Sequence, residues 1–364
     1  MINQPKQFHG SDLETISNVF AIEKTRIIPF AANVNPLGLS DTVKKVLRNH
    51  IDCISSYPDR NYKELKESLA DYTGADLSHI YVGNGSSELI RLCIEYVSPK
   101  KAMVITPAYA EYERCIKMHG GEVVDYMLTE EQEFKLDVSE FLTHLDDSLD
   151  MLIICNPNNP TSTAIKADDL ETILDTCKVL NIFVMIDETY VEFHPDMEHV
   201  TAVPLVPAYE NLCVVRGVSK FFAAPGLRLG YTVCSNEVFY GVLNSIETPW
   251  NVNSFAIEAG KVMFTDETYI TETKNLIHIE QSLVYSALKS RKTIKVFKPE
   301  ANFILVKLLK EEQTAKQVFE YCMETGFMIR DCTDYKGLGE KYIRFCFMNP
   351  SDDDKVVNRL LEII

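Results

Sequence analysis

The sequence lacks long hydrophobic runs, since its longest apolar stretches span about half a dozen residues and a bilayer-crossing helix needs roughly 20. It is also short of positive charge: 36 Lys and Arg face 53 Asp and Glu, which gives a net charge of −17. That charge argues against binding to nucleic acids or anionic membranes. Residues 1–6 lead into polar sequence without the apolar core of a signal peptide. We therefore expect a cytoplasmic protein with no membrane or nucleic-acid partner.

The ten cysteines include no C-x-x-C pair. Several of them, Cys93, Cys155, Cys213 and Cys234, lie inside apolar runs. This pattern indicates buried free thiols in a reducing compartment rather than a disulfide framework or a zinc site. We expect no metal centre.

What the sequence does contain is a regular alternation of short apolar runs and amphipathic stretches. Its 364 residues exceed one ordinary hydrophobic core, so two domains are expected. The runs predict buried strands, and the stretches between them predict helices on both faces of a mostly parallel sheet. Strands are predicted at residues 80–82, 102–106, 151–155, 182–186, 212–215 and 230–234, and helices at 62–72, 89–97 and 170–180.

The pattern changes after about residue 265. A long helical stretch at 267–290 precedes alternating runs at 294–297, 303–306 and 342–347, which suit a smaller α+β domain. We expect a large domain over residues 46–265 and a small domain over 266–364. Residues 1–45 are expected to be irregular and to join the small domain.

Polar residues directly after the apolar runs are candidates for a site, because ligands gather at the carboxyl ends of parallel strands. G-N-G-S-S-E at 83–88 precedes a helix and suits phosphate binding, although it also reads as a simple capped turn. N-P-N-N-P-T at 156–161 is either a capped turn or part of the same site.

Two further segments carry stronger chemistry. D-E-T-Y at 187–190 places a carboxylate at a strand end, where it either caps a helix or meets a cation. In V-S-K-F-F-A-A-P-G-L-R-L-G-Y at 218–231, Lys220 has apolar neighbours that disfavour its ammonium form, which is what a Schiff-base amine needs. The turn at Pro225 and Gly226 directs Arg228 toward the same ligand.

Taken together, a phosphate cradle, an Asp, an Asn, a Tyr and a Lys describe a site for pyridoxal 5'-phosphate. The joint motif N-P-x-N-P-T, D-E-x-Y and S-K-x-x-x-x-P-G-L-R-x-G resembles the fold-type I pyridoxal-phosphate enzymes of the class I/II aminotransferase superfamily over nearly the whole chain. The resemblance implies that Lys220 binds the cofactor covalently and moves the proton. It implies that Asp187 pairs with the pyridinium nitrogen.

The same resemblance assigns the remaining cofactor contacts. Asn159 and Tyr190 would hydrogen-bond the ring oxygen, and Tyr109 would stack on the ring. The phosphate would be held by the turn at Gly85 together with Ser86, Ser87, Ser219 and Arg228. Tyr57 matches a tyrosine that reaches the cofactor of a neighbouring subunit, so the resemblance implies a homodimer; Tyr57 and Tyr109 also read as ordinary core aromatics.

Two families compete as the nearest resemblance, threonine-phosphate decarboxylases and histidinol-phosphate aminotransferases. Residues 30–38 (F-A-A-N-V-N-P-L-G), 220–226 (K-F-F-A-A-P-G) and 249–253 (P-W-N-V-N) look more like the decarboxylases. That resemblance implies decarboxylation of a small phosphorylated or phosphonate L-amino acid, within cobalamin biosynthesis. Transamination is the alternative, and a non-catalytic ligand-binding protein of this fold is a remote one.

The decarboxylase resemblance also assigns substrate contacts. His9 and Asn33 would bind the anionic tail of the substrate together with Arg330, and Arg344 would bind its α-carboxylate as a bidentate fork; His9 also reads as an ordinary surface histidine. Two positions depart from the decarboxylase pattern: Met348 stands where that family has a further arginine, and Ser11 where it has a glycine. Both departures leave the substrate and the reaction open.

Overall fold

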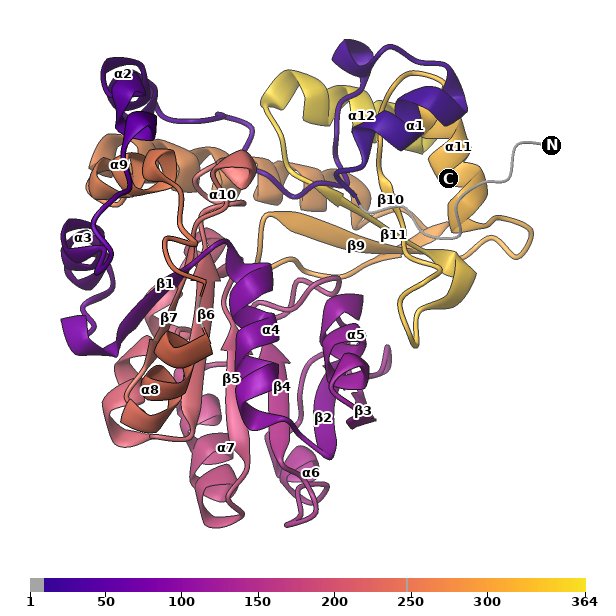
Figure 1. The fold of residues 1–364 in the computed structure, drawn as a ribbon. Coiled ribbons are helices and arrows are strands. Elements are labelled where there is room, and N and C mark those ends of the chain that lie inside the picture. The colour runs from indigo at the N-terminus through magenta and orange to yellow at the C-terminus, as the bar shows by residue number, and fades with distance from the viewer. Residues whose placement is uncertain (1–9, 247) are drawn as a thin grey trace.

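Two sheets surrounded by helices make up the fold in the computed structural model, which describes residues 10–246 and 248–364 (Figure 1). The larger sheet has the strand order β1-β7-β6-β5-β4-β2-β3, and β7 runs antiparallel to both of its neighbours while the other pairs are parallel. Its strands are β1 (Ile80–Gly83), β2 (Lys101–Thr106), β3 (Glu122–Met127), β4 (Met151–Cys155), β5 (Phe183–Asp187), β6 (Leu212–Gly217) and β7 (Gly230–Cys234). The predicted α/β fold with a mostly parallel sheet is confirmed.

Helices cover both faces of this sheet, which explains why its strands are continuous apolar runs. One face packs against α4 (Ser86–Val97), α5 (Ala110–Met118) and α8 (Glu237–Ile246). The opposite face packs against α6 (Val138–Leu142) and α7 (Ala167–Val179). Successive residues of one strand alternate between the two cores, so that Ile153 of β4 faces the first group of helices and Leu152 and Ile154 face the second.

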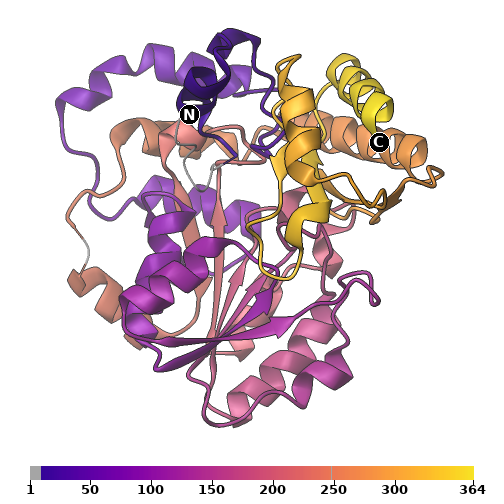
Figure 2. The ribbon, with the colours of Figure 1, turned by 90° about the vertical axis from the view of Figure 1, so that its right-hand side faces the viewer.

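A second, antiparallel sheet has the order β10-β11-β9-β8. Its strands are β8 (Ile294–Val296), β9 (Phe303–Leu308), β10 (Arg330–Asp331) and β11 (Tyr342–Cys346), and the helices α11 (Ala315–Met323) and α12 (Pro350–Ile363) lie beside it. The long helix α10 (Glu267–Leu288) packs on β9 and α12 and also on the turn Val191–Phe193 that follows β5. It therefore bridges the two sheets (Figure 2).

The first residues of the described chain are more regular than the sequence predicts. They form α1 (Leu13–Phe20) and α2 (Asp41–Asn49), capped by the side chains of Asp12 and Ser40. The prediction of an irregular segment was wrong here, because short helices with few buried residues leave little periodic signal.

Between these two helices the chain runs beside the smaller sheet. The Ala31 N–H donates to Met328 O at 2.7 Å, and the Cys346 N–H donates to Phe30 O at 2.8 Å. The remaining helices, α3 (Lys63–Thr73) and α9 (Ser254–Met263), pack against each other on the far side of β1. Within residues 10–246 and 248–364, no helix combines the length and the hydrophobicity that crossing a membrane requires.

Candidate active site

A cavity of about 500 Å³ opens between the two sheets, at the carboxyl ends of the parallel strands. Its walls come from the loops after β2, β4, β5 and β6, the first turn of α4, β10, β11 and the N-terminal segment. The predicted site residues that line it are Asn33, Ser86, Ser87, Tyr109, Asn159, Asp187, Tyr190, Ser219, Lys220, Arg228, Arg330 and Arg344. Residues far apart in the sequence thus converge on one cavity.

Lys220 lies half-buried in the loop after β6. Its ammonium Nζ donates a hydrogen bond of 2.6 Å to the carbonyl oxygen of Ala32. Burial, with a further contribution from the positive charge of Arg344, lowers the pKa of Lys220 from its ordinary value to about 8. A substantial fraction of the amine is therefore neutral near neutral pH, as a nucleophilic lysine requires.

Asp187 is the last residue of β5 and is buried. One of its carboxylate oxygens accepts the Thr189 backbone N–H at 2.9 Å and the Thr189 hydroxyl at 2.5 Å. The other oxygen accepts the Tyr112 hydroxyl at 2.6 Å. Burial raises the pKa of Asp187, whereas these hydrogen bonds lower it because they favour the ionised form. The carboxylate is held in one orientation at the cavity wall.

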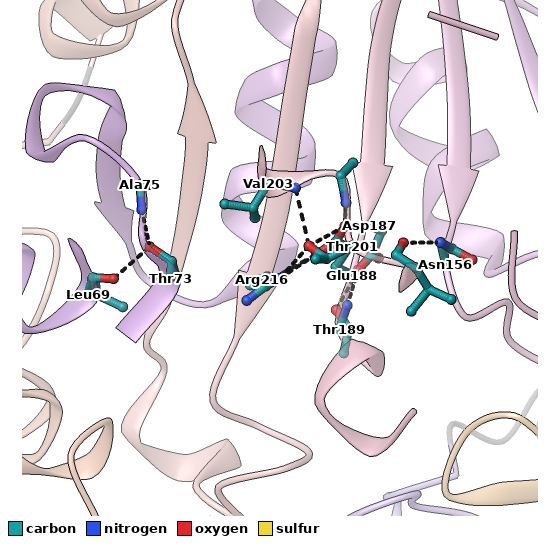
Figure 3. A network of polar contacts seen from close by, with 12 residues as sticks. Leu69, Thr73, Ala75, Asn156, Asp187, Glu188, Thr189, Thr201, Val203 and Arg216 are labelled. Carbon is teal, nitrogen blue, oxygen red and sulfur yellow. Dashed lines mark hydrogen bonds and ion pairs between the residues drawn. The ribbon is translucent and has the colours of Figure 1, made fainter. Parts of the chain in front are cut away.

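Glu188 points away from the cavity and forms a buried ion pair with Arg216 of β6 at 2.7 Å (Figure 3). The same carboxylate accepts the Thr201 hydroxyl at 2.9 Å and the Ala202 N–H at 2.6 Å. These bonds fasten the residue next to Asp187 to the neighbouring strand and to the following loop. They fix the backbone from which Asp187 projects.

The turn before α4 forms a concave surface of backbone N–H groups. Gly85 has φ +86°, and a Cβ there would come within 2.5 Å of the Arg228 guanidinium, so only glycine fits. Gly230 lies equally close, since its Cβ would be 2.6 Å from the Ser86 backbone nitrogen. The first N–H groups of a helix have no intrahelical partner, and beside Arg228 they provide a site for a phosphate group.

Arg344 of β11 is 3% exposed and reaches across the cavity to Asn159 in the loop after β4, to whose Oδ1 it donates through Nη1. Its Nη2 donates to Ala31 O at 2.8 Å. Two buried polar atoms at this end of the cavity have no hydrogen-bond partner among the described residues: Arg344 Nε and Asn33 Oδ1. An unpaired donor of a buried arginine calls for an anionic ligand.

Arg330 lies at the smaller-sheet side of the cavity and is already paired. Its Nη2 donates to both carboxylate oxygens of Asp334, at 2.8 and 2.6 Å, and its guanidinium packs over the Tyr335 ring at 5.2 Å. Tyr335 and Asp334 line the cavity too.

Of the predicted residues, Gly85, Tyr57 and His9 are not among those lining the cavity. Gly85 lies directly behind Arg228. Tyr57 is 77% exposed outside the cavity and stacks on Trp250 at 4.4 Å. His9 lies outside the described residues. Tyr109 does line the cavity, and burial raises its pKa to about 12.

Sequence reasoning missed Tyr112, Thr189, Asp334 and Tyr335. Tyr112 and Thr189 each stand within three residues of a predicted site residue and carry a hydroxyl, so proximity in the sequence was the available signal. Nothing in the sequence shows that Asp334 pairs with Arg330, because that contact depends on how the chain turns after β10.

Comparisons with known proteins agree with this geometry. A family model described as Aminotransferase class I and II matches residues 25–360. The threonine-phosphate decarboxylase of Salmonella typhimurium is 32% identical over 98% of this chain and 96% of its own length.

Two solved structures are also similar. The histidinol-phosphate aminotransferase of Clostridium acetobutylicum has a TM-score of 0.85 at 30% identity, covering 92% of this chain and 98% of that one. The L-threonine-O-3-phosphate decarboxylase of Porphyromonas gingivalis has a TM-score of 0.80 at 26% identity, covering the same two shares. The predicted resemblance is confirmed: the chain belongs to the aminotransferase class I and II family, whose members are pyridoxal-phosphate-dependent enzymes.

Proposed function

We propose that the chain is a pyridoxal-phosphate-dependent decarboxylase of a small phosphorylated L-amino acid, a reaction that the family resemblance links to cobalamin biosynthesis. One observation carries the cofactor assignment. Lys220, with its pKa lowered to about 8, shares one cavity with the buried Asp187 carboxylate and with the cradle at Gly85, Ser86 and Arg228. An amine, an anion and a phosphate site together fit pyridoxal phosphate.

Each residue then has a defined task toward the cofactor. Lys220 Nζ binds its aldehyde carbon, and Asp187 pairs with its ring nitrogen. Asn159 accepts from Arg344 through Oδ1, so its amide N–H group is the end that donates to the ring oxygen, beside the Tyr190 hydroxyl. Ser86, Ser87, Ser219 and Arg228 hold the phosphate, and Tyr109 covers one ring face. When bound, the cofactor withdraws electrons from the Cα of the attached amino acid.

The substrate contacts follow from the unpaired polar atoms. Arg344 Nε meets the α-carboxylate, and Asn33 Oδ1 accepts from a donor on the bound molecule. In decarboxylation the Cα–carboxylate bond breaks, CO₂ leaves and its electron pair stays at Cα. Lys220 lies in the same cavity and supplies the proton that Cα then takes up. Arg344 therefore orients the bond that breaks.

The aminotransferase reaction is the second candidate, because the histidinol-phosphate aminotransferase of Clostridium acetobutylicum is similar in fold and in sequence. Lys220 and Arg344 serve either reaction. The two are separated by incubating the purified holoenzyme with O-phospho-L-threonine or O-phospho-L-serine, with and without a keto-acid acceptor. Acceptor-independent CO₂ release supports the decarboxylase. Amino transfer that exceeds CO₂ release for every phosphorylated substrate contradicts it.

We further propose a homodimer in which Tyr57 contacts the cofactor phosphate of the partner subunit. Tyr57 is 77% exposed and lies outside its own chain's cavity, which suits a contact made across an interface. Mixing Lys220→Ala and Tyr57→Phe chains tests this. One of the two sites of a mixed dimer then has both residues intact, so mixing should restore activity above either homodimer. Unchanged activity in dimers proved to be mixed would contradict the proposal.

A further inference from the structure

The end of the cavity nearest the smaller sheet contains an ion pair that a ligand must break. Arg330 is the cationic residue of β10 that lines this end, and Asp334 occupies it with both carboxylate oxygens at 2.8 and 2.6 Å. The two side chains are 15% and 26% exposed, so the pair is only partly screened by water. Both side chains belong to one short turn, which keeps the carboxylate close to the guanidinium.

The other cations that line the cavity in the described part of the chain are committed elsewhere. Arg228 lies at the cradle beside Gly85, and Lys220 donates to Ala32 O. Arg344 donates to Asn159 and to Ala31 O. A negatively charged substrate tail at this end therefore meets an arginine whose charge is already compensated.

We infer that Asp334 is a specificity-determining residue that competes with the anionic tail of the substrate for the Arg330 guanidinium. The inference rests on the proposed function, because it presumes an amino acid with an anionic tail. A tail that leaves Asp334 in place puts two anions side by side, which is unfavourable. A tail that displaces Asp334 must form a stronger bidentate pair than the carboxylate does.

This competition selects by charge. A phosphate monoester above its second pKa of about 6 carries two negative charges and three acceptor oxygens, whereas a carboxylate tail carries one charge and two oxygens. The dianion gains more from Arg330 than Asp334 does, and a monoanionic carboxylate offers no advantage over it. The site therefore favours amino acids with a dianionic phosphate or phosphonate tail and rejects acidic amino acids such as glutamate.

The test is the Asp334→Asn variant of the holoenzyme, with dissociation constants read from the absorbance change of the bound cofactor on titration with amino acids. Because a charge-assisted pair contributes roughly 1.5–3 kcal/mol, we expect O-phospho-L-threonine and O-phospho-L-serine to bind about tenfold more tightly to the variant. Binding of L-glutamate should also improve, whereas L-threonine and L-serine should change by less than about twofold.

Glu111→Gln is the matched control, because Glu111 lines the same cavity but pairs with Arg114. It removes the same charge without releasing Arg330. In an Arg330→Met background, Asp334→Asn should lose its effect on phosphorylated ligands. Equal gains in Asp334→Asn and Glu111→Gln, or a gain that persists without Arg330, would overturn the competition.

The inference and the proposed function fail in distinguishable ways. If the wild-type enzyme releases CO₂ from a phosphorylated amino acid but Asp334→Asn binds that amino acid no better, the competition is wrong and the decarboxylase stands. If Asp334→Asn tightens binding of phosphorylated amino acids but neither protein releases CO₂, the competition stands and the decarboxylase is wrong.

Discussion

The Tyr112 hydroxyl donates a 2.6 Å hydrogen bond to the carboxylate of Asp187. Tyr112 belongs to the first turn of α5, and Asp187 ends β5, which lies two strands away from β2 in the sheet. Burial raises the pKa of Asp187, and the Tyr112 hydroxyl opposes that rise by stabilising the ionised form. Tyr112 is therefore a positioning residue for the group proposed to face the cofactor nitrogen.

The Tyr112→Phe variant should shift the pH dependence of activity. Losing one hydrogen bond to the carboxylate raises the Asp187 pKa further, by about one unit, so the acidic limb of the kcat/KM profile should move to higher pH. We expect kcat/KM near neutral pH to fall about tenfold, with a smaller change at high pH.

Tyr209→Phe is the matched control, because the Tyr209 hydroxyl donates to Asp175 at 2.7 Å away from the cavity. It should leave the acidic limb where it is. An unchanged profile in Tyr112→Phe would show that the hydroxyl contributes packing alone.

Lys220 should carry the cofactor covalently. Its lowered pKa and its place in the cavity make it the lysine suited to react with an aldehyde. Borohydride reduction followed by peptide mapping should find the pyridoxyl group on Lys220, and Lys220→Ala should remove the label. Lys307→Arg, outside the cavity, should retain it. A label on another lysine in the wild-type enzyme would refute the assignment.

Strands were the most predictable part of the fold. The bounds of β4 and β7 match the apolar runs at 151–155 and 230–234, because a strand buried on both faces is apolar throughout. The edge strand β3 (Glu122–Met127) was not predicted, since its residues are only partly buried and include two acidic side chains. The antiparallel direction of β7 also left no mark on its composition.

The candidate site was predictable where chemistry and place coincide. Asp187, Asn159 and Lys220 are polar residues that directly follow apolar runs, and the sheet brings such strand ends together. Contacts between side chains were not predictable. The pairing of Arg330 with Asp334 depends on a turn, and the bond from Tyr112 to Asp187 depends on how α5 packs on the sheet. The division of the chain into domains at residues 45 and 265 stays a prediction.

Glu188 should matter for stability rather than for binding. Its partner Arg216 is buried, and breaking a buried ion pair by removing one charge costs about 3–5 kcal/mol. Glu188→Gln should therefore lower the urea midpoint of unfolding strongly. Glu130→Gln is the control, since Glu130 pairs with the partly exposed Lys307 and should cost about 1 kcal/mol or less. Equal shifts in both variants would show that the buried network stabilises no more than a surface pair.

Asp353 and Glu280 form a carboxyl pair between α12 and α10, and they are 1% and 3% exposed. Burial, together with the neighbouring Glu280, raises the pKa of Asp353 to about 8, although the Met348 N–H opposes this by donating to the carboxylate. The folded protein therefore holds a proton that the unfolded chain releases near pH 4. The stabilisation is present in full below pH 4 and is lost as the pH rises toward 8.

The Asp353→Asn variant removes this titration while keeping an acceptor for the Met348 N–H and a neutral neighbour for Glu280. We expect its melting temperature to be close to that of the wild type at pH 5 and higher than the wild type at pH 8.5. Asp41→Asn is the control: the Asp41 pKa is lowered, mainly by the hydrogen bond to Lys44, so the carboxyl stays ionised from pH 5 to 9. Its difference from the wild type should not depend on pH across that range. If the difference between Asp353→Asn and the wild type were equally constant, the pair would hold no proton in the folded state.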